Sequence, residues 1–313
     1  MLRYTVRRLA LIGISLLVLS LLVFMIMEVL PGDVARVILG LHATEQQAQA
    51  LRVQLGLDKP PHIRYWLWLR GVLTGDLGES LSLHAPIGPV LARRTAHSLL
   101  LGLPAAVIGL PLAILQGFIA GLRRPPWLGH LLSTGAVIIS SFPRFLIAMF
   151  LILLLSETAG WFPGSSIVET GSPLHSPRIL VLPLLSLVLS MTAYNLRITR
   201  ASVVKVLDAE FVVAAELKQL PLHTVLWRHV APNALLPTVT VVAGYLGWLI
   251  GGLVIIESIF TYPGLGLLIY TAAKARDVPL LEAAVLATAS FRMIANLAAD
   301  LLYGVLDPRV RFS

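Results

Sequence analysis

The sequence predicts an all-α polytopic membrane protein with six transmembrane helices, and three observations support this fold class. Of the 313 residues, 57% are hydrophobic and only 13% are charged, against roughly 25% charged residues in ordinary soluble domains. The apolar residues are grouped in long blocks rather than in the periodic pattern of half-buried helices or strands. Lys and Arg gather at the ends of these blocks, as is typical of loops on the cytoplasmic side of a membrane.

The first apolar block runs from Leu9 to Met27 and follows a basic segment with three arginines. A secretory signal peptide is the competing interpretation. The block is about 19 residues long, whereas the apolar region of a signal peptide has about 7 to 15 residues. The following Glu28-Val29-Leu30-Pro31 offers no small-x-small cleavage site. We therefore expect a retained first transmembrane helix.

Five further blocks are long enough to cross a hydrocarbon core of about 30 Å, which takes about 20 helical residues. Several contain proline or glycine, which membrane helices tolerate where neighbouring helices satisfy the freed backbone groups. The five blocks are Leu99–Gly121, Leu131–Ser156, Ile179–Leu196, Pro237–Glu257 and Leu281–Tyr303.

The basic residues predict the orientation of the chain. With the N-terminus inside, the short outside loops hold only Arg178, Lys274 and Arg276. The cytoplasmic segments then hold a much larger set: Arg3, Arg7, Arg8, Arg123, Arg124, Arg197, Arg200, Lys205, Lys218, Arg228, Arg309 and Arg311. Both termini are therefore expected to be cytoplasmic.

These expectations divide the chain into three regions. Residues 1–30 form the cytoplasmic N-terminus and first transmembrane helix, and residues 31–98 form an extracytoplasmic loop region. Residues 99–313 form a five-helix transmembrane core with a cytoplasmic loop at 197–236. The extracytoplasmic region contains a polar helical stretch, Thr44–Leu55, and an apolar and aromatic run, Tyr65–Leu69. That run predicts either an interfacial helix that shields the bundle or a contact with a delivery protein.

Several chemistries are excluded by composition and spacing, so we expect no catalytic, cofactor or metal site in this chain. The absence of cysteine excludes disulfides, thiolate metal sites and Cys nucleophiles. None of the four lysines follows a glycine, so a phosphate-binding P-loop is excluded, and the histidines lack zinc-ligand spacing. The net charge of +8 lies in short clusters rather than in one patch, which argues against nucleic-acid binding.

Ionisable residues inside apolar blocks are costly and are therefore functional candidates. Glu257, Arg292 and Asp300 are the candidates of this kind, together with Arg144. Arg292 lies deepest and is expected to face the bundle interior, where Glu257 or Asp300 is available to pair with it. Arg144, Glu257 and Asp300 lie near predicted helix ends, where reaching the interface is an equal alternative.

These charges define the main alternative function, an ion-coupled secondary transporter or channel. Such carriers often show internal repeats, and none is visible in this sequence. A membrane-embedded hydrolase is a third class, but the sequence offers no nucleophile–base pair for it.

The cytoplasmic loop carries the most specific pattern. Its segments Ala214–Leu220, Arg228-His229 and Asn233–Pro237 resemble the coupling loop of importer permeases of the ATP-binding-cassette superfamily. Further motifs extend the resemblance along nearly the whole chain to the first of the two permeases in dipeptide, oligopeptide and nickel systems. They are Leu30–Asp33, Leu55–Pro60, Gly75–Ser80, Trp161–Pro163, Glu257–Gly266 and Leu306–Arg309.

The resemblance implies a type I ABC importer permease fold in a bacterial inner membrane. It also implies four kinds of partner: a second homologous permease, two ABC ATPases that carry ATP and Mg, an extracytoplasmic substrate-binding protein, and the lipid bilayer. Peptides are the implied substrate, with nickel chelates, glutathione and oligosaccharides as alternatives. The implied ATPase-coupling residues are Ala214, Ala215, Glu216, Leu217, Lys218, Gln219, Leu220, Arg228 and Pro237.

A short amphipathic helix in this loop can seat its apolar side in a groove of a partner. The sequence places Phe211, Val212, Leu220 and Leu226 on that side, and Glu216, Lys218 and Arg228 at its rim. One residue departs from the family pattern, because Gln219 stands where glycine is usual. A left-handed turn at a residue other than glycine costs about 1 kcal/mol. We expect either that cost or a reshaped turn, with Pro221 opening a second short helix.

Overall fold

The structure is a computed structural model, and it describes residues 2–29, 39, 44–54, 56, 58–122, 125–167, 173–235 and 251–306. The chain forms two compact units, which are described separately below. Unit 1 comprises residues 1–98 and 263–293, and unit 2 comprises residues 99–262 and 294–313. Two long helices, α5 (Ile87–Gly121) and α13 (Val278–Leu306), contribute residues to both units.

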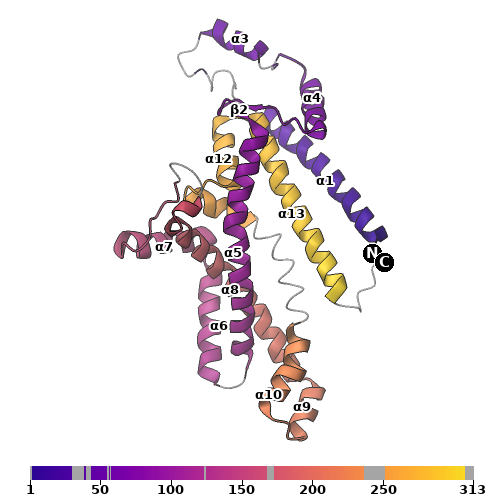
Figure 1. Cartoon of the computed structure of the whole chain (residues 1–313), viewed down its shortest axis with the longest axis vertical. Coiled ribbons are helices and arrows are strands. Elements are labelled where there is room, and N and C mark those ends of the chain that lie inside the picture. Colours follow the sequence, from indigo (N-terminus) through magenta and orange to yellow (C-terminus); the bar gives the residue numbers. More distant parts are fainter. Residues whose placement is uncertain are drawn as a thin grey trace. The chain divides into compact units, whose positions relative to one another are not determined.

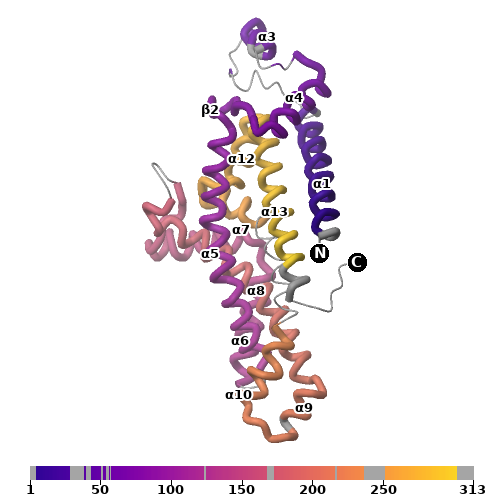
Figure 2. Tube along the Cα trace, turned by 45° about the vertical axis from the view of Figure 1, so that its right-hand side comes forward, coloured from indigo at the N-terminus to yellow at the C-terminus, as the bar shows by residue number. Residues whose placement is uncertain are grey.

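Unit 1 combines α1 (Leu2–Val29) and the starts of α5 and α13 with the region that the sequence predicts to be extracytoplasmic (Figure 2). Its core is formed where the start of α5 packs against α12 and the start of α13, through side chains such as Ile87, Leu268 and Leu280. A two-stranded antiparallel hairpin precedes α5, with Glu79 opposite Pro86 and Ser80 opposite Ala85. Besides α5 and α13, its elements are α1 (Leu2–Val29), α3 (Glu45–Gln54), α4 (Pro61–Thr74), β1 (Glu79–Ser80), β2 (Ala85–Pro86) and α12 (Leu265–Ala275).

Unit 2 is a helical bundle, and residues 251–259 are also helical in it. Its largest core cluster includes Leu101, Leu182, Met191, Phe260 and Tyr262. A second cluster joins α5, α6 and α8 (Figure 1). Besides α5 and α13, its elements are α6 (Pro126–Ser141), α7 (Arg144–Leu151), the π-helix η1 (Ile152–Thr158), the 3₁₀ turn η2 (Pro173–His175), α8 (Arg178–Leu207), α9 (Glu210–Leu217), α10 (Leu222–Thr224) and the π-helix η3 (Val225–Val230).

Within the described residues, four helices are long and apolar enough to span a membrane, which confirms the all-α membrane fold. They are Thr5–Glu28, Ile87–Gly121, Arg178–Leu207 and Val278–Leu301, and they match the first, second, fourth and sixth expected spans. Most of the fifth expected span, Pro237–Glu257, lies outside the described residues. The total of six therefore stays a prediction.

The third expected span, Leu131–Ser156, is not one continuous helix. It consists of two helical segments, Pro126–Ser141 and Arg144–Thr158, bent by 104° at the break. Phe142 is extended, with φ −92° and ψ 137°, and precedes Pro143. Proline lacks an N–H donor and disfavours a helical conformation at the residue before it. The sequence contained the cause of the break, but a proline inside a membrane helix does not always produce one.

Glycines allow α5 and α8 to approach closely. A Cβ atom at Gly117 would lie 2.5 Å from the Cβ of Thr199, and one at Gly121 would lie 2.7 Å from the Cβ of Val203. Both distances are below contact range, so only glycine fits without a shift of the neighbouring helix. Gly117 and Gly121, four residues apart, thus form the face of α5 on which α8 packs closely.

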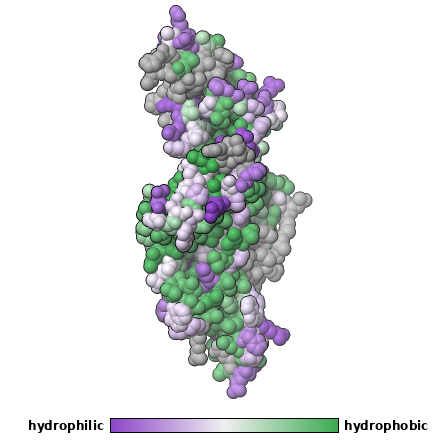
Figure 3. All heavy atoms as spheres, turned by 60° about the vertical axis from the view of Figure 1, so that its left-hand side comes forward, coloured by the Kyte–Doolittle hydropathy of each residue, from purple (hydrophilic) through white to green (hydrophobic). Residues whose placement is uncertain are grey.

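The surface of α1 is mainly apolar. In the most apolar 18-residue stretch of α1, only 11% of the stretch is buried within the chain. Apolar residues also cover much of the face of the molecule drawn in Figure 3. One stripe of α1 is different, because Ser20 and Phe24 are buried against α4. Ser20 Oγ lies 2.8 Å from the hydroxyl of Tyr65, and Glu28 forms an ion pair with Arg64 at 3.1 Å. The aromatic run Tyr65–Leu69 therefore lies on a helix, α4, that contacts α1 through this stripe.

Candidate functional site

The loop that is predicted to be cytoplasmic forms a small helical hairpin at residues 208–235. We call it the coupling segment, after the role that the sequence predicts for it. Its inner side chains, which include Val212, Ala215, Val225 and Val230, pack against Val203 and Leu207 at the end of α8. Phe118 of α5 borders the same cluster and stacks on Trp227, with ring centroids 6.0 Å apart. The hairpin is therefore fixed to α8 and α5 by an apolar core of its own.

The turn after α9 keeps the left-handed conformation with glutamine in place of glycine. Gln219 has φ +54°, and the N–H of Leu220 donates to the carbonyl of Ala215 at 3.3 Å. A left-handed residue followed by this hydrogen bond is the Schellman arrangement that ends many helices. Pro221 then precedes α10, as expected. The turn is not reshaped, so the conformational cost expected for a residue other than glycine remains.

The inner and outer sides of the coupling segment differ in part from the sequence prediction. Val212 is completely buried, and Leu226 packs partly against the same cluster, so both face the protein's own core. Phe211 and Leu220 are exposed as predicted. Helical periodicity indicated that one side is apolar, but it did not reveal that this hairpin has two apolar sides.

The outer side of the coupling segment has large apolar side chains that are exposed. Such exposure over one segment is typical of a protein interaction site. Leu217 is 79% exposed and Trp227 is 69% exposed. The full exposed set comes from α9, the turn, α10 and η3: Phe211, Val213, Leu217, Leu220, Leu222 and Trp227.

The other predicted coupling residues have varied positions. Ala214, Lys218 and Arg228 are exposed, while Ala215 is buried beneath them. The side chain of Glu216 and all of Pro237 lie outside the described residues. Ala214 and Lys218 thus join the outer side with the exposed apolar residues, and Ala215 supports it from within.

The intramembrane charges lie in different environments. Glu257 is completely buried within unit 2, so its side chain faces the interior of that unit. Burial, and then the nearby carboxylate of Glu257, raise the pKa of Tyr262 above its usual range. Arg292 is exposed and Asp300 is partly buried on α13, so Arg292 does not face the interior of its own unit as expected. Pairing of Arg292 with Glu257 or Asp300 stays a prediction.

Unit 1 contains a buried carboxylate that the sequence analysis did not predict. Asp277 is completely buried, and its Oδ2 accepts hydrogen bonds from Ser80 Oγ, Ser82 N and Ser82 Oγ at 2.5, 2.9 and 2.8 Å. Its Oδ1 accepts from Leu280 N at 3.2 Å and so caps the first turn of α13. Asp277 therefore fastens the β1–β2 hairpin to α13. The signal was present, because aspartate directly before a helix is a common N-cap.

Two family models match this chain over nearly its whole length. The model described as "Binding-protein-dependent transport system inner membrane component" matches residues 99–312. The model described as "Binding-prot-dependent transport system membrane comp, N-term" matches residues 1–91. The two matches fall on either side of the start of the expected transmembrane core at residue 99.

Curated relatives cover the full chain. A protein of Brucella abortus (strain 2308) that is named as a peptide transport system permease is 36% identical over 298 residues, which are 95% of each chain. The glutathione transport system permease protein GsiC of Escherichia coli (strain K12) is 34% identical over 312 residues, which are 100% of each chain.

A solved structure has the same fold. The crystal structure of an amino acid ABC transporter with histidines matches with a TM-score of 0.54 and 14% sequence identity. The match covers 71% of this chain and 94% of the other chain. At 14% sequence identity this likeness shows the fold alone.

Proposed function

The chain belongs to the family of binding-protein-dependent transport system inner membrane components, and on this premise we propose that it forms the translocation pathway of an ATP-driven importer for peptides. Relatives named for peptide and for glutathione transport support this substrate class, and glutathione is itself a small peptide. Nickel chelates and oligosaccharides are the remaining alternatives within the family.

The proposed assembly places this chain beside a second homologous permease in a bacterial inner membrane. Two ABC ATPases bind ATP and Mg on the cytoplasmic side, and a substrate-binding protein delivers the peptide from outside. Both termini of the chain are cytoplasmic. The first transmembrane helix, within residues 1–30, anchors the chain. Residues 31–98 form the extracytoplasmic region, and residues 99–313 form the transport core. In this assembly ATP hydrolysis takes place in the partner subunits, and this chain catalyses no reaction.

The coupling segment is the proposed contact with an ATPase. The observation that carries this proposal is the exposure of Leu217 and Leu222 on either side of a turn whose backbone is held by hydrogen bonds. An amphipathic helical segment of this kind binds by seating its apolar side chains in a groove. Because the inner side is fixed to α8, a movement of the ATPase is transmitted to a membrane helix.

Co-purification tests this contact. The tagged chain is expressed with its neighbouring subunits, either as wild type or with Leu217 and Leu222 both replaced by Asp. The matched control is Leu73→Asp on α4, since Leu73 is 76% exposed and Leu217 is 79% exposed. We expect an ATPase to accompany the wild type and the control, and to be lost from the double variant while the variant remains in the membrane.

Two results would contradict the proposal. If the double variant retains the ATPase, the coupling segment is not the contact. If no ATPase accompanies the wild type, the importer assignment fails, and an ion-flux assay of Glu257, Arg292 and Asp300 variants then tests the alternative of a secondary transporter or channel.

A further inference from the structure

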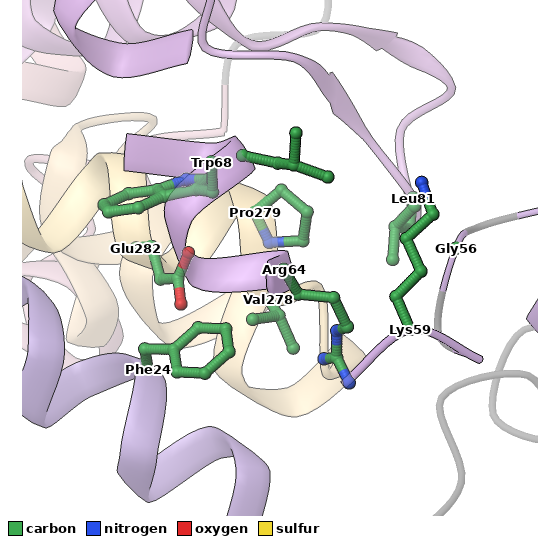
Figure 4. Close-up of a pocket in the computed structure, with 10 residues that line it drawn as sticks. Phe24, Gly56, Lys59, Arg64, Trp68, Leu81, Val278, Pro279 and Glu282 are labelled. Atoms are coloured by element: carbon green, nitrogen blue, oxygen red, sulfur yellow. The ribbon is translucent and has the colours of Figure 1, made fainter. Parts of the chain in front are cut away.

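Unit 1 contains a pocket of about 210 Å³ that no step of the proposed transport cycle uses (Figure 4). Its walls come from the end of α1, from α4 and the residues before it, from the β1–β2 connection and from the start of α13. The aromatic and charged residues among its lining are Phe24, Lys59, Arg64, Trp68 and Glu282.

Two residues that line this pocket each have a buried polar atom with no hydrogen-bond partner among the described residues. The two atoms are Oε1 of Glu282, whose side chain is 2% exposed, and Nε1 of Trp68. Leaving one such group unsatisfied costs about 1–3 kcal/mol. Buried polar groups of this kind are rare in native structures. Because indole N–H is only a donor, it is the free acceptor on Glu282 that indicates a ligand with a hydrogen-bond donor at this pocket.

The part of the pocket next to Glu282 suits an ammonium group. Figure 4 shows the carboxyl group of Glu282 between the ring of Phe24 and the indole of Trp68. Aromatic faces attract cations, and the free acceptor on Glu282 accepts a hydrogen bond from an N–H or O–H donor. A primary ammonium satisfies both conditions. A trimethylated ammonium has the same charge but no N–H.

The other polar lining residues suit an anion. Lys59 and Arg64 are cationic, and each contacts the same pocket. Arg64 is joined to Glu28 through Nη1 and Nη2, and a guanidinium carries five N–H donors, so some donors are left over. Cationic side chains bind phosphate oxygens strongly. The pocket is therefore complementary to a ligand with an ammonium and a phosphate close together.

The surroundings of the pocket are apolar. On α1, the helical turns next to Phe24 expose Leu21, Leu22, Met25 and Ile26, and α4 exposes Trp66. Exposed aliphatic residues next to an exposed tryptophan are typical of the boundary between lipid and water. A soluble zwitterion has no apolar groups to pack against this surface, whereas the acyl chains of a lipid can pack against it.

We propose that this pocket binds the headgroup of a phospholipid with a primary ammonium, such as phosphatidylethanolamine. The ammonium is held by Glu282 between Phe24 and Trp68, the phosphate by Lys59 and Arg64, and the acyl chains lie along the exposed side of α1. The bound lipid ties α4 and α13 to α1 on the extracytoplasmic side of the membrane. This site is independent of the ATPase contact and of the transported substrate.

Native mass spectrometry of the purified importer tests the proposal. The delipidated complex is incubated with phosphatidylethanolamine, phosphatidylcholine or phosphatidylglycerol with identical acyl chains. We expect about tenfold stronger retention of phosphatidylethanolamine, since a hydrogen bond to a charged group contributes on the order of tenfold or more in affinity. In Glu282→Gln, the retention of phosphatidylethanolamine should fall to about the retention of phosphatidylcholine. Glu157→Gln, at an exposed glutamate of unit 2, should leave it unchanged.

Other outcomes would overturn the site. Equal retention of the three lipids excludes recognition of the ammonium, and an unchanged preference in Glu282→Gln excludes this pocket. Binding of soluble glycerophosphoethanolamine without binding of the lipid excludes the role of the acyl chains. If Glu282→Gln does not assemble, Lys59→Gln replaces it. Because Lys59 is exposed, its loss should weaken retention of phosphatidylethanolamine without unfolding the chain, and unchanged retention excludes the site.

Discussion

At the scale of single residues, Gln219 shows how a turn can keep its shape with an unfavourable residue. Its φ of +54° lies in the left-handed region, where a side chain is crowded by the backbone. The neighbouring contacts of Ala215, Val225 and Val230 hold the hairpin together and compensate for this cost. The family-like turn is thus maintained by packing rather than by the residue that forms it.

Replacing Gln219 by glycine should therefore raise the free energy of unfolding by about 1 kcal/mol. Gln219→Val should lower it, because a β-branched side chain is least compatible with positive φ. Thermal unfolding of the purified protein in detergent measures both changes. A lower melting temperature for Gln219→Gly would mean that the glutamine side chain makes a stabilising contact.

Asp277 is the second residue with a clear expected effect. Its carboxylate accepts three hydrogen bonds from Ser80 and Ser82 and also caps α13. Asp277→Ala should lower the free energy of unfolding by about 2–4 kcal/mol and should expose the β1–β2 hairpin to proteases.

The matched control for Asp277 is Asp76. This exposed aspartate accepts one hydrogen bond, from Gly78 N at 2.9 Å. Asp76→Ala should cost less than about 1 kcal/mol. Equal melting temperatures and equal proteolysis for the two variants would show that Asp277 does not fasten the hairpin.

At the scale of elements, the contact between α5 and α8 depends on glycine. Gly117→Ala should lower the free energy of unfolding by about 1–3 kcal/mol, because the new methyl group overlaps Thr199 and the helices must separate. Gly135→Ala on α6 is the control, since nothing lies within 4 Å of a Cβ atom at that position. It should be neutral or slightly stabilising, given the better helix propensity of alanine. Thermal melts that rank the two variants in the opposite order would refute close packing at Gly117.

The helices of this chain follow from its sequence more directly than the environments of its side chains do. Apolar block length predicted four of the spans, because a membrane helix needs about 20 apolar residues regardless of its neighbours. The break at Phe142 and Pro143 was not predicted, because its cost depends on contacts that neighbouring helices supply. Asp277 and Glu282 were missed for the same reason. Their importance comes from Ser80, Ser82 and Trp68, which lie far away in the sequence.

At the scale of the whole molecule, the predicted orientation can be tested directly because the chain contains no cysteine. A single cysteine at Lys218, in the coupling segment, should react with a membrane-impermeant maleimide only after the cells are opened. A single cysteine at Glu45, which is exposed at the start of α3, should react in spheroplasts from outside. The reverse pattern would invert the topology and remove the coupling segment from the side where ATP is available.

The helix α1 has two kinds of surface, and we expect different patterns of amino-acid substitution on them among orthologues. Most of its side chains are exposed and apolar, and for these positions a lipid environment accepts one aliphatic residue almost as well as another. Ser20, Phe24 and Glu28 instead contact particular partners on α4. Among orthologues, Leu, Ile, Val and Met should therefore exchange freely around most of the helix. Ser20, Phe24 and Glu28 should change rarely, and then together with Tyr65 or Arg64.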